Sequence, residues 1–512
     1  MFEGQPKGLW TLALANTGER FGYYTMLAVF ALFLGENFGF AAGLASEIYT
    51  WFLTLVYFLP LFGGMAADRW GYSRMVVIGI FIMFIGYLLL SVPLGGGTVA
   101  IAAMGGALLL VSVGTGLFKG NLQVMVGDLY NDPKYADKRD SGFSLFYMLI
   151  NVGALFAPTA AIKIMDWAQL SLGYSKADSY HFAFAVACVS VIASILIYYL
   201  GKKTFSQVLT VKKKEKVVDE VVDEMSPSET RERIICLVLV FTVVVFFWMA
   251  FHQNGQSLTW FARDYTQSTA EGWSRIGFNI WALALIATSV YTLFGIFQSE
   301  KASGKIGCGV VTAVLWSGAY AIFRGLPNPL EIQPQLFQQF NPFFVVALTP
   351  VSMAIFSALA AKKTAKHPEG MEPSAPKKIG IGMLVAACGY LVMIFASIGQ
   401  PSPASLNGTV APDPVVPMYL IGTYLILTFA ELLLSPMGIS FVSKVAPPKY
   451  KGLMMGLWFA ATAIGNYLSS IPGLLWKKLS LTANWGLLMG LCVAAGVVMF
   501  AMLKKLEAAT KD

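Results

Sequence analysis

Long apolar runs alternate with short polar segments along the chain. Clear examples are MVVIGIFIMFIGYLLLSV (75–92), IICLVLVFTVVVFFWMAF (234–251) and IGIGMLVAACGYLVMIFAS (379–397). A run of 18 or more apolar residues is long enough to cross a bilayer as a helix. The pattern predicts an all-α polytopic membrane protein with about fourteen spans: 8–34, 47–67, 74–92, 98–127, 142–168, 181–200, 234–262, 277–297, 306–323, 336–361, 379–399, 416–444, 452–472 and 484–503.

Composition supports this class. Of the 512 residues, 56% are hydrophobic and 12% are charged, whereas a soluble chain carries roughly 25% charge. The first span is too long for the apolar region of a signal peptide, so we expect no cleavable leader. The five cysteines fall inside predicted spans without disulfide or metal spacing, and we interpret them as small core residues.

Basic residues are unevenly divided between the loops. The segment 201–233 holds eight Lys and Arg residues and 362–378 holds five, while 35–46, 93–97 and 400–415 hold none. Loops rich in Lys and Arg stay in the cytoplasm. We therefore expect a multi-pass protein of the plasma or inner membrane with both termini cytoplasmic, and the net charge of +8 follows from this asymmetry.

The charged segment 201–233 divides the chain into residues 1–200, with six spans, and 234–512, with eight. The spans 277–297 and 306–323 are joined by a short turn, so we expect a hairpin, about 273–325, inserted into a second half of six spans. Six plus six spans around a cytoplasmic linker resemble the major facilitator transporters, whose halves rock about a central site. The expected fold is two six-helix bundles plus a peripheral two-helix hairpin.

A short loop strengthens that resemblance. GGMAADRWGYSR (63–74) lies between the second and third spans and is similar to the facilitator loop signature. Glycines permit a tight turn, and the aspartate can cap a helix end and pair with an arginine. The matching residues of this structural loop motif are Gly64, Asp68, Arg69, Gly71 and Arg74.

Five ionisable side chains lie where apolar residues are expected: Glu19, Arg20, Lys119, His252 and Glu431. An ionised group at the bilayer centre costs about 2.5–3.5 kcal/mol or more, so such residues usually face a cavity and have a function. We found no metal-ligand spacing, His-Glu-x-x-His motif or nucleotide-binding loop. The sequence therefore favours a transporter over an enzyme, with no metal, cofactor or nucleic acid.

The surroundings of these charges resemble one family. GERFGYY (18–24) is similar to the first-helix motif of the proton-dependent oligopeptide transporters, and FSLFYMLINVGALFAP (143–158) to their fifth-helix signature. Further segments match in family order: GLFKGN (116–121), FNPFFVVALTP (340–350), FAELLLSPMG (429–438) and GLWFAATAIGN (456–466).

The resemblance implies roles for several residues. Arg20 and Lys119, with Tyr24, would bind the carboxylate of a di- or tripeptide, and Glu431, with Asn341 and Asn151, its amino terminus. Tyr23, Tyr57, Trp248, Gln253 and Trp458 would line the pocket. Glu19, Lys119 and His252 are the candidates for proton coupling, with protons as the coupling ion and no other cofactor. Ionised Glu19 would pair with Lys119, and protonation of Glu19 would release the lysine. Burial raises the pKa of a carboxyl group, so such a group can be protonated by a proton gradient.

The sequence departs from the family pattern at three positions. Asn16 replaces the first motif glutamate, Leu27 replaces an arginine, and His252 stands where a seventh-helix glutamate is usual. Histidine titrates near pH 6.5, which makes His252 a possible substitute proton carrier. A structural role for His252 remains the alternative.

Three readings of function stay open. The leading one is proton-driven symport of di- and tripeptides by a monomer in the lipid bilayer. The alternatives are the same fold carrying nitrate or another anion, and a peptide carrier with altered or weak proton coupling. Glu431 discriminates between peptide and anion, because a carboxylate suits an ammonium group and repels an anion. The preferred peptide, the proton stoichiometry and the role of the hairpin are left open.

Overall fold

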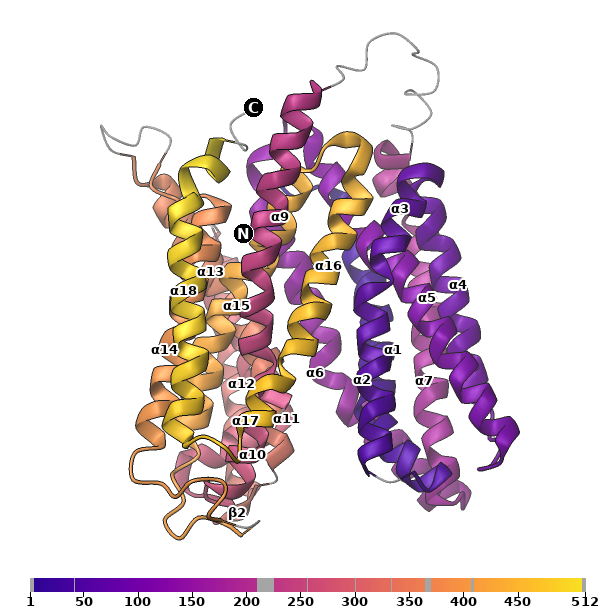
Figure 1. Ribbon diagram of the computed structural model, residues 1–512, viewed down its shortest axis with the longest axis vertical. Helices are drawn as coiled ribbons and strands as arrows, with labels where there is room; N and C mark the ends of the chain where they lie inside the picture. Colours follow the sequence, from indigo (N-terminus) through magenta and orange to yellow (C-terminus); the bar gives the residue numbers. More distant parts are fainter. Residues whose placement is uncertain are drawn as a thin grey trace. The chain divides into compact units, whose positions relative to one another are not determined.

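The structure is a computed structural model that describes residues 4–40, 42–209, 225–255, 257–299, 301–332, 334–363, 370–406 and 409–508. It is built almost wholly of helices (Figure 1). The α-helices are α1 (Lys7–Phe38), α2 (Ala42–Phe58), α3 (Pro60–Trp70), α4 (Tyr72–Leu90), α5 (Thr98–Asp128), α6 (Arg139–Leu172), α7 (Lys176–Leu200), α9 (Pro227–Phe251), α10 (Ser257–Asp264), α11 (Ile280–Gln298), α12 (Ala302–Gly325), α13 (Phe340–Ala361), α14 (Ala375–Ala396), α15 (Met418–Val445), α16 (Lys451–Leu468), α17 (Ser470–Leu475) and α18 (Leu481–Ala508).

Short elements connect these helices. One small antiparallel pair, β1 (Thr269–Ala270) and β2 (Leu330–Glu331), brackets the hairpin region, with Thr269 opposite Glu331. The 3-10 helices are η1 (Leu129–Asn131), η2 (Ala136–Lys138), η3 (Lys202–Phe205), η4 (His252–Gly255), η5 (Gly272–Phe278), η6 (Pro334–Gln339) and η7 (Pro448–Tyr450).

Each expected span corresponds to helix in the structure. Within the described residues, 12 segments are long and apolar enough to cross a membrane. Helix α1, which carries the Glu19–Arg20 pair, and α16 are not among them, so the count of fourteen spans stays a prediction.

Two expected spans contain an interruption, although the first, 47–67, still lies within one segment that is long and apolar enough to cross a membrane, Glu47–Trp70. The span 47–67 divides at Leu59, where α2 ends and Pro60 begins α3; proline lacks the N–H that a continuing helix needs and suits a first helical position. The span 234–262 divides after Phe251, where the η4 turn separates α9 from α10. His252 is therefore the first residue of a turn, and not a mid-helix residue.

The chain forms two compact units. The N-terminal unit contains residues 2–242, 438–464 and 505–512, and the C-terminal unit contains residues 243–437 and 465–504. The expected divisions at 1–200, 201–233 and 234–512 remain predictions, and residues 210–224 of the linker lie outside the described residues. The N-terminal unit therefore includes the last part of α15 and most of α16.

Helices of the N-terminal unit approach closely at glycines. Gly79 of α4 lies against the carbonyl of Gly114, where an added Cβ would come within 2.6 Å of the oxygen. Serines of α7 donate to carbonyls of α1: Ser194 to Ala15 at 2.7 Å, and Ser190 to Gly18. Hydroxyl-to-carbonyl bonds of this kind join helices without leaving a polar group unpaired in the bilayer.

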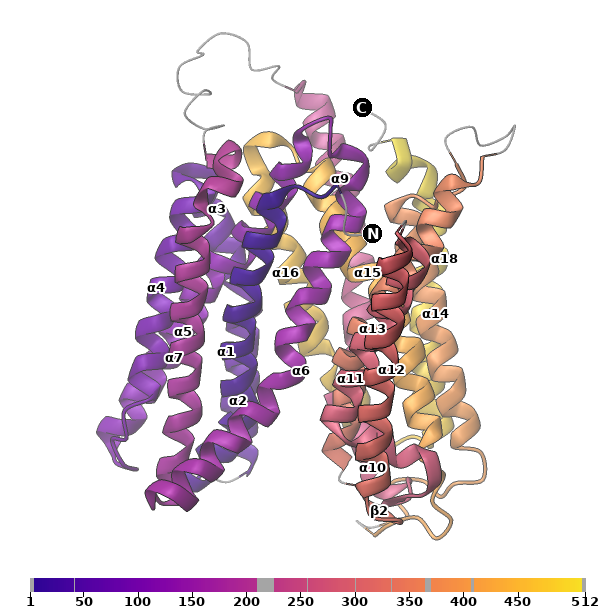
Figure 2. The ribbon, with the colours of Figure 1, turned by 180° about the vertical axis from the view of Figure 1, so that it is seen from behind.

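The hairpin of α11 and α12 lies on the side of the C-terminal unit. Figure 2 shows α11 and α12 beside α13, and Tyr291 of α11 donates to the carbonyl of Val346 in α13 at 2.6 Å. The two hairpin helices are joined by Thr292 and Thr312, whose hydroxyls are 2.6 Å apart. Most side chains of α12 are exposed, among them Ile306, Val310, Val314 and Tyr320. This agrees with the expected peripheral position.

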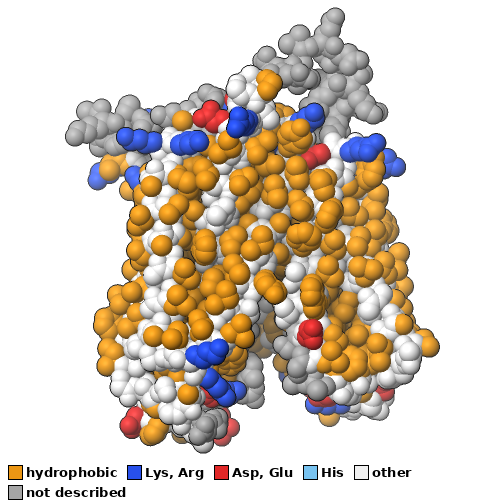
Figure 3. Space-filling view, viewed as in Figure 1, with side chains coloured by type: hydrophobic (Ala, Val, Ile, Leu, Met, Phe, Trp, Pro, Cys, Tyr) orange, Lys and Arg blue, Asp and Glu red, His pale blue; other side chains and the backbone are white. Residues whose placement is uncertain are grey.

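The outer surface is that of a membrane protein. On the face seen in Figure 3, hydrophobic side chains cover the sides of both units, and Lys and Arg side chains lie near the ends of each, more of them at the upper end of the view. The five cysteines are all free thiols within helices. Cys188, Cys236 and Cys492 are buried as expected, but Cys388 is exposed, so the core interpretation is wrong for that residue.

Candidate functional site

Glu19 and Arg20 form an ion pair in the middle of α1. Arg20 Nε and Nη2 donate to the two carboxylate oxygens of Glu19 at 2.5 Å each. Both side chains are buried, at 0% and 2% exposure. Glu19 is therefore paired with Arg20 in this structure, and not with Lys119 as expected. Bidentate arginine–carboxylate pairs are stronger than point-charge pairs with lysine.

Lys119 of α5 is held by aromatic rings. Its Nζ lies 3.9 Å from the centroid of the Tyr57 ring and 4.6 Å from that of Phe459. The ammonium group is within electrostatic range of Arg20 and Glu19. Among the described residues it forms no ion pair within 4 Å, and its role in binding a carboxylate stays a prediction.

The remaining candidates of the N-terminal unit differ in exposure. The Tyr23 ring lies under the Arg20 guanidinium, 4.5 Å from its carbon, and stacks on Phe52. Tyr24 is half-buried and meets Tyr23 edge to face at 5.3 Å. Asn151 donates to the Tyr147 carbonyl in its own helix at 3.0 Å, so its amide N–H is used locally.

Glu431 anchors a polar cluster in the C-terminal unit. This residue of α15 is 3% exposed. Asn341, near the start of α13, donates to Glu431 Oε2 at 2.7 Å and to the Thr428 hydroxyl at 3.1 Å. The amide orients the carboxylate but leaves its negative charge uncompensated by that bond. Thr428 carries no sequence signal as a candidate, because its role depends on the packing of α13 against α15.

Trp248 and His252 form an aromatic group at the end of α9. Their rings stack at 5.2 Å, and Phe251 meets the His252 ring edge to face at 5.7 Å. The indole N–H of Trp248 is buried without a partner among the described residues, which suits a wall that accepts a ligand.

Gln253 has a structural role in this structure, and its expected place in the pocket stays a prediction. It is fully buried, and its amide donates to the carbonyls of Met249 at 3.0 Å and Ser469 at 2.9 Å. Its oxygen accepts from the Ser257 hydroxyl at 2.7 Å. Gln253 thus satisfies the backbone where α9 breaks and joins the break to the end of α16.

Trp458 is also buried, at 2% exposure. Its ring lies against Gly438, where any side chain would collide with the indole, and against Phe241 at 6.3 Å. Packing accounts for it in this structure, and its pocket role stays a prediction. The neighbouring Phe459, which the sequence did not single out, is the residue that reaches Lys119.

The loop motif forms a turn that binds a helix end. Gly71, between α3 and α4, has a φ of 98°, a conformation that favours glycine. Asp68 accepts hydrogen bonds from the backbone N–H groups of Gly452 and Leu453 at 2.8 Å each. Asp68 therefore caps a helix as expected, but the helix is α16, far along the chain. Gly64 lies against the Gly452 backbone, and a Cβ there would collide with it.

Further polar contacts surround this cap in the N-terminal unit. Lys451 Nζ pairs with Asp128 Oδ1 at 2.8 Å. Arg139 donates to the Ser443 hydroxyl at 2.7 Å, and the Ser440 hydroxyl donates to Asp140 Oδ1 at 2.5 Å. Asp68, Asp128, Arg139 and Asp140 thus all contact residues 440–453. No sequence motif indicated these residues, apart from Asp68.

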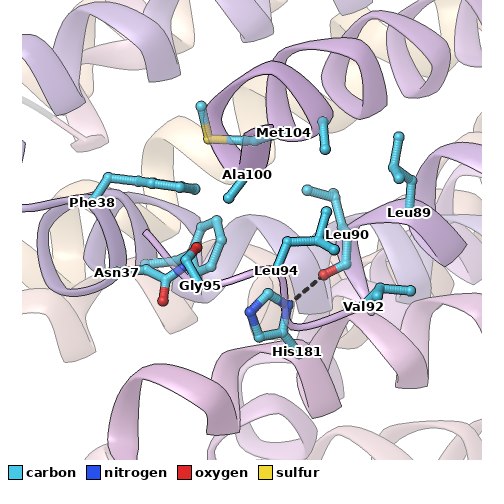
Figure 4. A pocket seen from close by; sticks show the side chains of 12 residues that line it. Asn37, Phe38, Leu89, Leu90, Val92, Leu94, Gly95, Ala100, Met104 and His181 are labelled. Atoms are coloured by element: carbon cyan, nitrogen blue, oxygen red, sulfur yellow. Dashed lines mark hydrogen bonds between the residues drawn. The ribbon is translucent and has the colours of Figure 1, made fainter. Parts of the chain in front are cut away.

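A small pocket lies elsewhere in the same unit, where α1, α4, α5 and α7 meet (Figure 4). Phe38, Leu94 and Met104 line it, and His181 lies at its edge with Nδ1 bonded to the Leu90 carbonyl at 2.6 Å. Its volume of about 20 Å³ holds about one water. It is too small for a peptide. Within the described residues, no group of three or more His, Cys, Asp or Glu is placed to hold a metal ion.

Apolar membrane-spanning helices with charged side chains buried among them are typical of a membrane transporter. The chain belongs to the POT family, whose model matches residues 73–227 and 312–484.

Similar proteins cover nearly the whole chain. An uncharacterized transporter, YclF, of Bacillus subtilis is 27% identical over 100% of this chain and 96% of its own length. The peptide transporter YePEPT of Yersinia enterocolitica is 29% identical, covering 92% and 88%. A di-/tripeptide transporter of Lactococcus lactis subsp. cremoris is 26% identical, covering 92% and 89%.

Solved structures show the same fold. A crystal structure of a peptide transporter POT in complex with sulfate has a TM-score of 0.61 and 24% identity, covering 100% of this chain and 97% of that one. A POT family transporter in complex with 5-aminolevulinic acid has a TM-score of 0.63 and 20% identity, covering 99% and 98%.

Proposed function

We propose that this transporter is a proton-coupled symporter of di- and tripeptides. The observation that carries the proposal is the charge of the two buried clusters. In the N-terminal unit, Glu19 is paired with Arg20, and the Lys119 ammonium, which lies against the Tyr57 ring, would supply the positive charge. In the C-terminal unit, the Glu431 carboxylate, which accepts from Asn341, would supply the negative charge. A zwitterionic peptide supplies one group of each sign.

Recognition by charge fits a carrier of many peptides. The carboxylate would bind Lys119 and Arg20, and the ammonium group Glu431, whatever the side chains between them. Curated relatives are named as di- and tripeptide transporters, which supports this substrate class. Both clusters belong to one chain, so we propose that a monomer is the working unit.

The Glu19–Arg20 pair supports a route for proton coupling. A substrate carboxylate and the Glu19 carboxylate compete for the same guanidinium. Protonation of Glu19 would end that competition and free Arg20 for the substrate. His252 remains a second candidate, since it lies beside Trp248 in the C-terminal unit. We propose that the basic ends of the two units and both termini face the cytoplasm, as the loop charges indicate.

Uptake by proteoliposomes tests the proposal. An inward proton gradient should drive accumulation of a labelled dipeptide, and Lys119→Ala and Glu431→Ala should each abolish accumulation. Lys176→Ala is the matched control, because Lys176 is a surface residue paired with Glu36, and it should transport normally.

Competition experiments test the role of Glu431 and distinguish a peptide carrier from an anion carrier. An excess of unlabelled dialanine should block uptake, while N-acetyl-dialanine, which lacks the ammonium group, should compete weakly. Equal competition by the two would overturn the role of Glu431. Competition by nitrate, with none by dialanine, would support the anion carrier in place of the peptide carrier.

A further inference from the structure

Tyr87 of α4 has a buried hydroxyl that packing does not explain. The residue is 0% exposed, and its hydroxyl has no hydrogen-bond partner among the described residues. Phenylalanine would fill the same space without desolvating a polar group. An unpaired buried hydroxyl in a native structure therefore calls for a partner that appears in another state.

The position of Tyr87 is fixed by the packing of α4. Gly86 lies against α5, where an added Cβ would come within 2.8 Å of Val111. The next residue points about 100° further round the helix, away from that contact. One turn later, the Leu90 carbonyl accepts from His181 of α7 (Figure 4). These contacts hold the Tyr87 ring in the interior of the unit.

The charges that act on the Tyr87 hydroxyl are those of Glu19 first and Arg20 second, followed by the Cys188 thiol of α7. In the structure both oxygens of Glu19 accept from Arg20, and the Tyr87 hydroxyl forms no hydrogen bond with them. A protonated carboxyl is different: it has an O–H donor and a carbonyl acceptor. Released from Arg20, it needs a neutral partner.

We propose that the Tyr87 hydroxyl hydrogen-bonds the Glu19 carboxyl when that carboxyl is protonated and Arg20 has left it. Tyr87 is thus a positioning residue that stabilises the proton-loaded state. The inference deepens the proposed function and rests on the coupling role given there to Glu19.

Most other groups around Glu19 do not titrate or are already bonded. The Tyr23 hydroxyl is also buried and unpaired among the described residues, but its ring is held against the Arg20 guanidinium. On α6, the residues that face this part of α1 are Gly153 and the Leu149 carbonyl, which do not titrate. On α7, Ser190 and Ser194 are already bonded to α1 carbonyls. The titratable or charged groups on the remaining sides are Arg20, Tyr23 and Tyr24 of α1, Tyr57 of α2, Lys119 of α5 and Cys188 of α7.

Infrared difference spectroscopy of the purified full-length protein tests the inference. The carbonyl band of protonated Glu19, assigned by its loss in Glu19→Gln, is titrated between about pH 4 and 8 in the presence of dialanine. In Tyr87→Phe we expect the band at higher frequency and its midpoint roughly 0.5–1 pH unit more acid. That shift corresponds to the three- to ten-fold effect of one ordinary hydrogen bond.

Tyr198→Phe is the matched control. Tyr198 is another buried tyrosine of this unit, and its hydroxyl lies 2.8 Å from the Ser73 hydroxyl. Its loss should lower the melting temperature and leave the Glu19 band unchanged. Tyr87→Phe should not lower the melting temperature, because its hydroxyl is unbonded in the ion-paired state.

Each outcome decides the question. An identical band and midpoint in wild type and Tyr87→Phe overturn the inference while leaving the proposed transport intact. A Glu19 that never protonates in this range overturns both the inference and the coupling role of Glu19. A shifted band in a protein that fails to take up dialanine supports the inference and overturns the peptide proposal.

Discussion

The capping of α16 by Asp68 gives a prediction whose size follows from the structure. The N–H groups of Gly452 and Leu453 belong to the first turn of α16, where backbone donors have no partner within the helix. Asp68 accepts from both at 2.8 Å, and Tyr72 donates to it at 2.6 Å. A carboxylate at a helix N-terminus also gains from the positive end of the helix dipole.

Asp68→Asn retains the size of the side chain and removes its charge. One oxygen can still accept, but the amide that replaces the other oxygen must face an N–H donor. The loss of one charge-assisted hydrogen bond costs about 1.5–3 kcal/mol, and the loss of charge at the helix end about 0.3–1 kcal/mol. The sum, about 2–4 kcal/mol, corresponds to roughly a 30- to 900-fold weaker docking of α16 on α3.

Hydrogen exchange measures this change directly. The amides of Gly452 and Leu453 should exchange faster by about that factor, provided that opening is at equilibrium. Asp132→Asn is the control, because Asp132 caps only an exposed local turn at Lys134; it should leave these two amides unchanged. Unaltered protection of Gly452 and Leu453 in Asp68→Asn would refute the assigned role of the aspartate.

Two further predictions concern the break after α9. Gln253→Leu should lower the free energy of unfolding by about 1–3 kcal/mol, because the buried partners of its amide lose their hydrogen bonds. Gln338→Leu is the control: it removes one exposed hydrogen bond of 3.3 Å and should leave thermal unfolding nearly unchanged. His252→Gln should keep counterflow exchange of dipeptide and lose gradient-driven uptake if His252 carries the proton; wild-type, pH-dependent uptake by that variant would show that the histidine is structural.

The sequence predicts the helices well because membrane insertion depends on local hydropathy. It does not predict where a helix breaks when side chains elsewhere satisfy the freed backbone groups. Pro60 is a visible signal for the break between α2 and α3. The break at His252 has no such signal, apart from the nearby Gly255, because it depends on Gln253 reaching the carbonyl of Ser469.

The sequence also identifies charged candidates better than their partners. Glu19 and Arg20 stand out because charges are rare at membrane depth. The family resemblance made Lys119 the expected partner of Glu19, and neighbouring residues on a helix do not normally face each other. The structure shows instead that the long arginine folds back onto its neighbour. The contact of Phe459 with Lys119 could not be predicted, because it needs the packing of α16 against α5.

The Glu19–Arg20 pair makes substrate affinity depend on pH with a definite sign. Ionised Glu19 holds Arg20 away from a peptide carboxylate, so dipeptide should bind more tightly as pH falls and Glu19 gains its proton. If binding requires one proton, the dissociation constant rises by up to about ten-fold per pH unit above the midpoint. Glu19→Gln mimics the protonated form and should bind tightly at every pH between about 5 and 8, as measured by calorimetry. Glu36→Gln, which alters a surface pair, should retain the wild-type dependence. A Glu19→Gln variant with the wild-type slope would assign the proton to another group, with His252 the next candidate.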